Sequence, residues 1–522
     1  MIDRHLHDSV SYSDIVELSL RQHPERPALV QDGRCLSYGE LRAAVRDMQD
    51  RLLSAGLARS DGIAQLSSNR IEAVIVQLAA FGLGLRYTPL HPMGSIDDHA
   101  YIVQDAEVSA LVVEPRQFAD HGREIAQRAP GLQHLWSHGP SAFGSDVFAL
   151  PTTGALERLK AKPHPEDVVA LLYTGGTSGR SKGVTLTNRS MVMNVLLTLS
   201  GWEWPAEIRF LCSTPITHAT GCMLVPILAR GGTIHLHAGF DAPRFLKEIE
   251  RSRINSTFLV PTMIYLLTDA QRGCPADTSS LETVIYGGAP ISPARLKEAI
   301  ALFGPVFMQI YSQSEAPNCA TVLRKDEHQD GADGRHASCG RPIPGIGVAL
   351  LDTANQPVRR GEIGEICLRG PSLMQGYWNK PEETAEALRG GWLHTGDLAR
   401  EDEEGFLHIV DRRKEMIVTG GFNVYPREVE DVITAHPAVD AAAVIGVPDE
   451  KWGEAVKAVV VVRDGAVLTA AEIMGWVREH KGAVATPKSI DFLDALPLTS
   501  LGKPDKKVLR AKYWAGQARQ VS

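Results

Sequence analysis

The sequence predicts an α/β fold, with a large N-terminal domain of layered α/β subdomains followed by a small α+β C-terminal domain. At 522 residues the chain is too long for one hydrophobic core and corresponds to roughly three to four folding units. Short apolar runs at residues 74–85, 110–113 and 168–173 are separated by polar helical segments, as is typical of a buried parallel layer. The sequence character changes after the charged stretch 411–415, which predicts domains over residues 1–411 and 412–522.

Two of these elements can be justified in detail. Ser37 and Glu40 have capping-box spacing, and apolar residues at helical intervals follow from Leu41 until Gly56, which predicts one helix. In the C-terminal part, strands are expected over 441–447, 455–462 and 489–493, a turn over 448–450 and a helix over about 470–481. This order of short strands and one helix indicates a compact α+β unit.

Composition excludes several classes of protein. A net charge of −8 without a long basic run argues against a nucleic-acid partner. The seven cysteines form no Cys-x-x-Cys pair, so neither a zinc site nor a disulfide framework is indicated. The polar start and the absence of a run of about 18 apolar residues argue against a secretory signal and an integral membrane segment. We therefore expect a cytoplasmic protein.

A loop rich in glycine and hydroxyl side chains follows the apolar run 168–173. It extends from Thr174 to Lys182, and such a loop can bind phosphate through backbone N–H groups, hydroxyls and one mobile positive charge. It is not a Walker loop, because Lys182 is followed by Gly183 and not by a hydroxyl residue. A nucleotide triphosphate is the expected ligand, and a flexible surface loop is the alternative for this segment taken alone.

A second strand, loop and helix unit is expected around residues 283–293. The strand 283–286 leads into glycines at 287 and 288, and Ser292 and Pro293 are suited to open a helix. Ligands bind at the carboxyl edge of open α/β sheets, so this loop could face the first one. A tight structural turn explains the same residues equally well.

Five further motifs follow in order. They are the segments 215–221, 309–315, 392–397, 411–430 and 501–503. With the two glycine loops, this ordered set resembles the adenylate-forming superfamily of acyl-CoA synthetases, firefly luciferases and peptide-synthetase adenylation domains. The resemblance extends from about Tyr38 to Leu509.

The resemblance implies a two-step reaction. A carboxylate attacks the α-phosphorus of ATP, pyrophosphate leaves, and the thiol of coenzyme A then intercepts the acyl-adenylate. Both first reactants are anionic, so the site must neutralise their repulsion. The implied catalytic residues are Lys503, Lys182 and Arg412, and Glu315 matches the residue that binds Mg²⁺.

The resemblance also assigns the binding residues. Tyr311 matches an aromatic residue that stacks on adenine, and Asp397 matches a ligand of the ribose hydroxyls. The implied ATP-binding set is Thr174, Gly175, Gly176, Thr177, Ser178, Gly179, Lys182, Gly288, Ala289, Pro290, Gln309, Tyr311, Ser314, Asp397, Arg412 and Lys503. The implied acid-binding set is His218, Gly221, Gly288 and Gln313, with His218 controlling access of the acid and not transferring protons.

The C-terminal domain is expected to be mobile. Lys414 occupies the position of the family's hinge residue, about which this domain rotates between the two half-reactions. In the second arrangement Gly420, Gly421 and Phe422 would line the pantetheine tunnel for coenzyme A. The rotation lets one cleft serve two reactions.

The sequence departs from the family pattern at a few positions. Gly175 replaces a serine, Ser181 a proline, and Ser312 and Ser314 a glycine and a threonine. No charged group that the chemistry requires is lost, although Ser181 could loosen the phosphate loop.

We expect an AMP-forming acyl-CoA synthetase for a fatty, alicyclic or aromatic monocarboxylic acid, with ATP, Mg²⁺ and coenzyme A as the small molecules bound. The alternatives are a stand-alone enzyme that loads a carrier protein and a non-catalytic nucleotide-binding regulator, while a luciferase-type oxygenase is not excluded by the motifs. A homodimer is compatible with the sequence.

Overall fold

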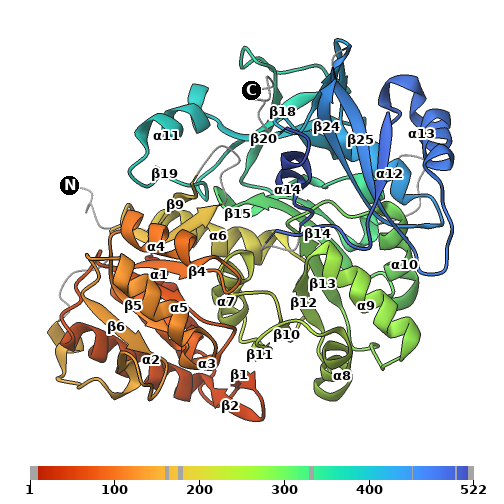
Figure 1. The fold of residues 1–522 in the computed structure, drawn as a ribbon. Helices are drawn as coiled ribbons and strands as arrows, with labels where there is room; N and C mark the ends of the chain where they lie inside the picture. The colour runs from red at the N-terminus through yellow and green to blue at the C-terminus, as the bar shows by residue number, and fades with distance from the viewer. Residues whose placement is uncertain are drawn as a thin grey trace, which may run out of the picture.

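The computed structural model describes residues 10–158, 164–174, 180–328, 334–449, 451–499 and 503–514. Over these ranges the chain forms a large mixed α/β N-terminal domain and a small C-terminal domain, which lies at the upper right in Figure 1. The predicted fold class is confirmed. None of the helices in the described ranges combines the length and the apolar character needed to cross a bilayer.

A nine-stranded sheet forms the centre of the large domain. Six neighbouring strands, from β14 to β1, run parallel, so their carboxyl ends lie at one edge. In spatial order the strands are β16 (Arg341–Pro342), β15 (Ala316–Leu323), β14 (Phe307–Gln313), β13 (Thr283–Gly287), β12 (Ser256–Leu259), β10 (Arg209–Cys212), β11 (Thr233–Leu236), β1 (Pro27–Gln31) and β2 (Arg34–Ser37).

A second sheet of eight strands and a third of four complete the large domain. The eight-stranded sheet runs β19 (Gly376–Tyr377), β9 (Lys182–Thr187), β8 (Val168–Thr174), β4 (Arg86–Leu90), β3 (Gly62–Leu66), β5 (Val108–Val113), β6 (His134–Ser137) and β7 (Ser145–Asp146). The four-stranded sheet runs β17 (Gly347–Leu351), β18 (Gly364–Arg369), β20 (Leu393–Glu401) and β21 (Leu407–Arg412), and it leads directly into the C-terminal domain.

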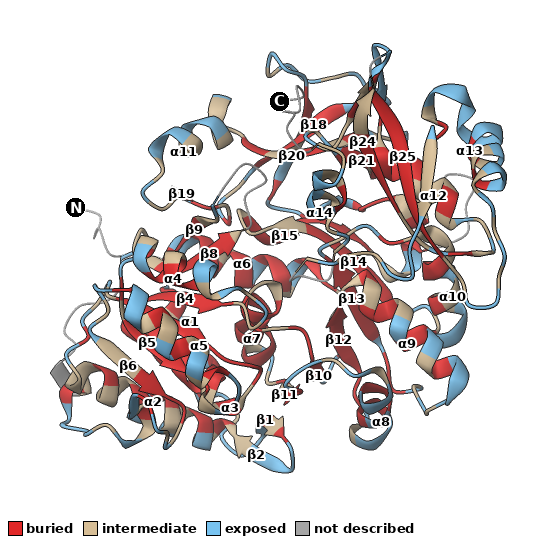
Figure 2. Ribbon diagram, in the orientation of Figure 1, coloured by how far each residue is buried: buried red, intermediate tan, exposed pale blue. Residues whose placement is uncertain are grey.

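Helices cover these sheets, and the strands inside are largely buried (Figure 2). The helices of the large domain are α1 (Tyr12–Arg21), α2 (Tyr38–Ser54), α3 (Ile71–Leu83), α4 (Ile96–Asp105), α5 (Pro115–Arg128), α6 (Asn188–Gly201), α7 (Ala219–Ala229), α8 (Ala242–Ser252), α9 (Pro261–Gly273), α10 (Pro293–Phe303) and α11 (Pro381–Ala387). The apolar run 74–85 belongs mainly to α3, which is buried on nearly every side and stops at Gly84 in the left-handed conformation.

The C-terminal domain is a five-stranded sheet with helices on both faces. Its strands are β23 (Phe422–Val424), β22 (Ile417–Thr419), β25 (Gly453–Val462), β24 (Val439–Asp449) and β26 (Ser489–Phe492), and its helices are α12 (Pro426–Thr434), α13 (Ala470–Ala485) and α14 (Lys506–Ala511). Alternation along β24 places Val444 against α12 and α13, and Ile445 against Leu509 of α14. Both faces of the sheet are therefore buried.

Several local predictions can be compared with these elements. The capping box of Ser37 and Glu40 forms, and it opens α2 as predicted. The predicted turn at 448–450 is wrong in its first two residues, because Pro448 and Asp449 still pair with Glu454 and Gly453 in the β24–β25 hairpin. The hairpin can extend through Pro448 because β24 lies at the edge of its sheet, where proline is tolerated.

Candidate active site

The carboxyl edge of the nine-stranded sheet gathers most of the predicted site. His218 follows β10, Gly288 follows β13 with φ of 79°, and Glu315 lies in the turn after β14. Parallel strands bring these three loops to the same edge, where open α/β sheets bind ligands. Gly288 and Pro290 are exposed and Ala289 is half-buried, so a ligand can reach that loop.

Asp397 is the centre of a polar cluster on this edge. Its carboxylate accepts hydrogen bonds from the Tyr311 hydroxyl at 2.6 Å and from Nε2 of Gln313 at 2.8 Å, and Nε of Arg412 lies 3.1 Å from its other oxygen. Asp397 on β20 lies directly opposite Arg412 on β21, so strand pairing fixes the ion pair. Burial and the Asp397 charge raise the pKa of Tyr311, which keeps its hydroxyl a donor.

Two residues predicted to contact ligands make hydrogen bonds within the protein. Gln313, predicted to bind the acid, directs its side-chain N–H groups to Asp397 and to the Thr395 carbonyl. Gln309, predicted to bind ATP, is buried and accepts a hydrogen bond from the Tyr286 hydroxyl at 3.0 Å. Both side chains are hydrogen-bonded to other residues of the protein. Their predicted contacts with ligands stay predictions.

A second cluster joins Glu315 to Lys182 through a tyrosine. The Tyr377 hydroxyl donates to Oε1 of Glu315 at 2.7 Å, and Nζ of Lys182 lies 4.9 Å from the centre of the Tyr377 ring. The short strand β19 positions Tyr377 by pairing with β9, which begins at Lys182. Sequence reasoning missed Tyr377, because a two-residue strand has no periodic pattern.

Glu315 can contribute to a magnesium site in the predicted manner. One of its oxygens is engaged by Tyr377, which orients the carboxylate and leaves the other oxygen to bind a cation. Mg²⁺ usually takes one or two carboxylates and completes its shell with phosphate oxygens and water. The donor set therefore fits Mg²⁺ bound together with a nucleotide.

Replacing Tyr377 with phenylalanine is expected to raise the KM for magnesium ATP about tenfold, since a hydrogen bond to a charged group is lost. The measurement is ATP–pyrophosphate exchange at varied ATP. Tyr513→Phe is the matched control, because the Tyr513 hydroxyl donates to Asp491 in the C-terminal domain. An unchanged KM in Tyr377→Phe would contradict the orienting role of this bond.

The phosphate loop itself lies partly outside the described residues. Gly175, Gly176, Thr177, Ser178 and Gly179 belong to the undescribed segment 175–179. Its two flanks are described: Thr174 ends β8 and pairs directly with Lys182 at the start of β9. The two ends of the predicted loop are thus held side by side, with Lys182 at its base.

His218 occupies the N-cap position of α7, although its side chain makes no hydrogen bond to the helix. Nδ1 of His218 lies 3.0 Å from the Thr217 hydroxyl, and burial lowers the pKa of the imidazole, which is therefore neutral near pH 7. A neutral ring suits the predicted control of access and gives no support to a charged role. Gly221 is required locally, because a Cβ there would lie 2.2 Å from the Ile216 carbonyl oxygen.

A small pocket lies beneath His218. Its volume is about 10 Å³, which is room for about one water molecule. The lining side chains carry no ionised group: they are Gln77, Phe81, Tyr87, Pro89, Ala170, Leu172, Leu186, Met191, Ile216, Thr217, His218, Gly221 and Cys222. An acid that extended in this direction would enter apolar surroundings.

Lys503 reaches the site from the C-terminal domain. Two hydrogen bonds hold its backbone: Thr499 N donates to the Lys503 carbonyl at 2.7 Å, and Lys503 N donates to the Thr499 hydroxyl at 3.2 Å. Burial and the nearby Arg412 guanidinium lower the pKa of Lys503 to about 8, while Asp397 opposes the shift. The charge of Lys503 also lowers the pKa of His218, so Lys503 lies within electrostatic range of both Asp397 and His218.

This lowered pKa predicts an alkaline limb in the activity of the enzyme free of substrate. Adenylation kcat/KM should fall as pH rises through about 8, because Lys503 then loses the proton that makes it a cation. The pH profile of pyrophosphate exchange measures it. Lys503→Arg should be slower but should lack this limb, since arginine stays charged; a limb that persists would assign it to another group.

The predicted hinge and coenzyme A residues lie in two turns near the start of the C-terminal domain. Lys414 is exposed in a turn closed by the Arg412 carbonyl, which accepts from Glu415 N at 2.8 Å. Gly420 and Gly421 have φ of 57° and 83°, and the Phe422 side chain is 61% exposed. Left-handed backbone at two consecutive residues explains both glycines.

Sequence reasoning also missed a buried cluster behind Asp397. Ligand atoms of Glu365, Cys367 and His394 lie within 4.8 Å of one another, a spacing that could hold a metal ion. However, the Glu365 carboxylate already lies 3.1 Å from Arg389 and accepts from Gly396 N at 2.9 Å. A carboxylate paired in this way has little charge left for a metal, so the cluster fixes the turn before Asp397.

Comparison with known proteins gives consistent matches over most of the chain. The family model of AMP-binding enzymes matches residues 16–378, and that of the AMP-binding enzyme C-terminal domain matches residues 428–503. The chain is 44% identical to the medium/long-chain-fatty-acid–CoA ligase FadD8 of Mycobacterium tuberculosis, over 96% of this chain and 90% of the relative. It is 35% identical to a feruloyl-CoA synthase of an Amycolatopsis species, over 94% and 97%.

A solved structure shows the same fold. The amide bond synthetase McbA from Marinactinospora thermotolerans superposes with a TM-score of 0.88 at 35% identity, over 96% of this chain and 99% of that one.

Proposed function

Since the chain belongs to the AMP-binding enzymes, within the acyl-CoA synthetase family of the adenylate-forming superfamily, and is an AMP-forming acid–CoA ligase, we propose that its substrate is an apolar monocarboxylic acid. The observation that carries this proposal is the pocket beneath His218, whose lining has no ionised side chain. A second carboxylate or an ammonium group on the acid would be buried there without a partner. Fatty, alicyclic and aromatic monoacids all satisfy this condition.

The relatives support the same class of acid. One is named for medium- and long-chain fatty acids and another for ferulate, an aromatic acid. The two together favour an apolar acid without choosing between an alkyl chain and a ring.

In the first step, three cations of this chain oppose the repulsion between the acid and ATP. Lys503 would bridge the incoming carboxylate and the α-phosphate, while Lys182 and Arg412 would contact phosphate and ribose. A carboxylate oxygen attacks the α-phosphorus as pyrophosphate leaves, and pre-placed positive charge stabilises the transition state. Mg²⁺ at Glu315 would neutralise further phosphate charge.

In the second step the C-terminal domain would rotate about Lys414. The thiol of coenzyme A loses its proton, its sulfur attacks the acyl carbon, and AMP leaves. Gly420, Gly421 and Phe422, which lie on an exposed turn in the described arrangement, would then line the pantetheine path. The boundary between residues 411 and 412, the homodimer and the cytoplasmic location stay predictions.

The decisive experiment offers the protein a library of monocarboxylic, dicarboxylic and amino acids with ATP and coenzyme A. Mass spectrometry of the products should show thioesters of apolar monoacids only. Parallel reactions with a carrier protein or an amine as acceptor test the other acceptors directly. Thioesters formed only from dicarboxylic or amino acids would contradict the proposed substrate, and nucleotide binding without pyrophosphate exchange for any acid would indicate the regulator.

A further inference from the structure

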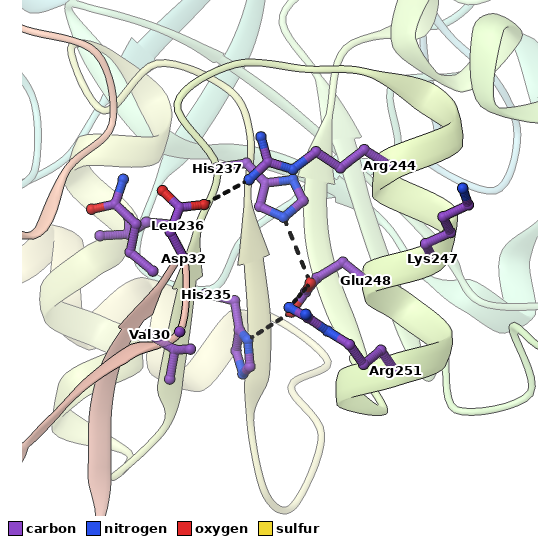
Figure 3. A pocket seen from close by; sticks show the side chains of 11 residues that line it. Val30, Asp32, His235, Leu236, His237, Arg244, Lys247, Glu248 and Arg251 are labelled. Carbon is purple, nitrogen blue, oxygen red and sulfur yellow. Dashed lines mark hydrogen bonds and ion pairs between the residues drawn. The ribbon is translucent and has the colours of Figure 1, made fainter.

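A second cavity lies on the same edge of the nine-stranded sheet, away from the Asp397 cluster. Its volume is about 360 Å³, within the range of small-molecule sites. It is bounded by the ends of the parallel strands β1 and β11 and by α8, as Figure 3 shows. Strands β10 and β12 separate β11 from β13, whose loop belongs to the active site.

The side chains around this cavity leave one positive charge uncompensated. Arg244 pairs with Asp32 at 2.8 Å, and Arg251 pairs with Glu248 at 2.6 Å, as the dashed line from Arg244 to Asp32 in Figure 3 marks for the first pair. Lys247 also lines the cavity, and no ion pair involves it among the described residues. A bound monoanion would complete the charge balance.

The cavity offers hydrogen-bond donors as well as charge. Each guanidinium has five N–H groups, so Arg244 and Arg251 keep donors beyond those used in their carboxylate pairs. His237 is 4% exposed, and its Nδ1 has no hydrogen-bond partner among the described residues. Burial lowers the pKa of His237, so the ring is a neutral group near pH 7.

Part of the lining is apolar. Val30 faces the cavity from β1, on the same face as its neighbour His235, while the Leu236 side chain lies on the opposite face of the sheet, in the main core. A bare inorganic anion would make no apolar contact with Val30 and would leave most of the cavity volume unfilled. A carboxylate attached to an apolar body matches both parts of the lining.

A buried hydrogen-bond chain connects this cavity with the loop before His218. Gln31, which lines the cavity, donates from Nε2 to the Asn69 carbonyl at 3.0 Å. The Asn69 side chain in turn donates to the Thr214 carbonyl at 2.9 Å and accepts from Ile216 N at 3.0 Å. The chain consists of buried residues: Gln31, Asn69 and Thr214. Because the surrounding interior is closely packed, a displacement of Gln31 would be passed on to the loop at Thr214.

We propose that this cavity is a second ligand site for a small organic carboxylate with an apolar body, and that its occupation acts on residues 214–218 through Gln31 and Asn69. The site would let the concentration of an organic acid influence the loop that carries His218. The ligand is bound outside the reaction centre and is not converted.

Binding is tested with the active site blocked by a non-hydrolysable acyl-sulfamoyl adenosine. Calorimetric titration with benzoate or hexanoate should show one site, and Lys247→Glu should weaken that binding at least tenfold. Arg478→Glu on α13 makes the same change of charge at an exposed position elsewhere and should leave binding unchanged. No binding to the blocked wild-type protein, equal binding by Lys247→Glu, or binding of phosphate in place of both acids would overturn the site.

Coupling is tested by hydrogen exchange of the blocked protein. Adding the bound acid should change exchange at the Ile216 amide at least threefold in the wild type and not in Lys247→Glu. Asn69→Ser should still bind the acid but lose this change. Binding without any change at Ile216 in the wild type would overturn the connection, and that measurement needs no variant to fold. Both readouts are independent of turnover, so they are separate from the test of the acid substrate.

Discussion

Replacing Lys503 with alanine is expected to lower the rate of adenylation by about 100- to 1,000-fold, the usual cost of removing one electrostatic contact to a transition state. The reason is its position: the Lys503 backbone is hydrogen-bonded to Thr499, and its ammonium group lies near the charges of Arg412 and Asp397. Without this cation, the carboxylate and the α-phosphate would meet with less of their repulsion cancelled.

The two half-reactions separate this effect from general damage. ATP–pyrophosphate exchange should fall, while conversion of supplied acyl-adenylate and coenzyme A into thioester should stay near the wild-type rate. Lys507→Ala is the matched control, because Lys507 is exposed on α14 in the same C-terminal segment. Equal loss in both half-reactions of Lys503→Ala would contradict the assigned role.

The opposite pattern is expected for Gly421→Leu, with thioester formation lowered at least 100-fold and adenylation retained. In the described arrangement a Cβ at Gly421 meets nothing within 4 Å, so a larger side chain has space there. The φ of 83° makes leucine strained by about 1–2 kcal/mol without preventing folding. In the proposed second arrangement the same side chain would fill the pantetheine path.

Gly465→Leu controls for the strain alone. Gly465 has φ of 77°, is exposed in the C-terminal domain and also has free space around its Cβ position. It should retain both half-reactions. If Gly465→Leu lost thioester formation as severely as Gly421→Leu, strain and not position would explain the result.

The fold could be predicted well because its signals are local. The capping box that opens α2 and the strand pattern of β24 and β25 depend on residues close in sequence. The same holds for the strand, loop and helix unit from β13 to α10, although Ser292, which precedes α10, makes no side-chain cap. The residues at the carboxyl edge of the sheet were predicted from the order of the sequence motifs.

The missing parts depend on contacts between distant segments. Tyr377 reaches Glu315 only because β19 pairs with β9, far away in the chain. Glu365 reaches Gly396 in the same manner through the pairing of β18 with β20. Likewise, no local pattern shows that Gln313 donates to Asp397, since these residues lie on β14 and β20, which belong to different sheets. Such contacts follow from topology and not from periodicity.

The strand register that places Asp397 opposite Arg412 would couple the predicted binding of ribose to the predicted rotation of the small domain. Arg412 comes two residues before Lys414, so a ribose hydroxyl that competed for the Asp397 carboxylate would loosen the Arg412 side chain next to the predicted pivot. Ribose binding and domain rotation would involve the same turn, because no helix or strand lies between Arg412 and Lys414. Binding and release of the nucleotide would therefore act directly on the start of the C-terminal domain, which is predicted to rotate.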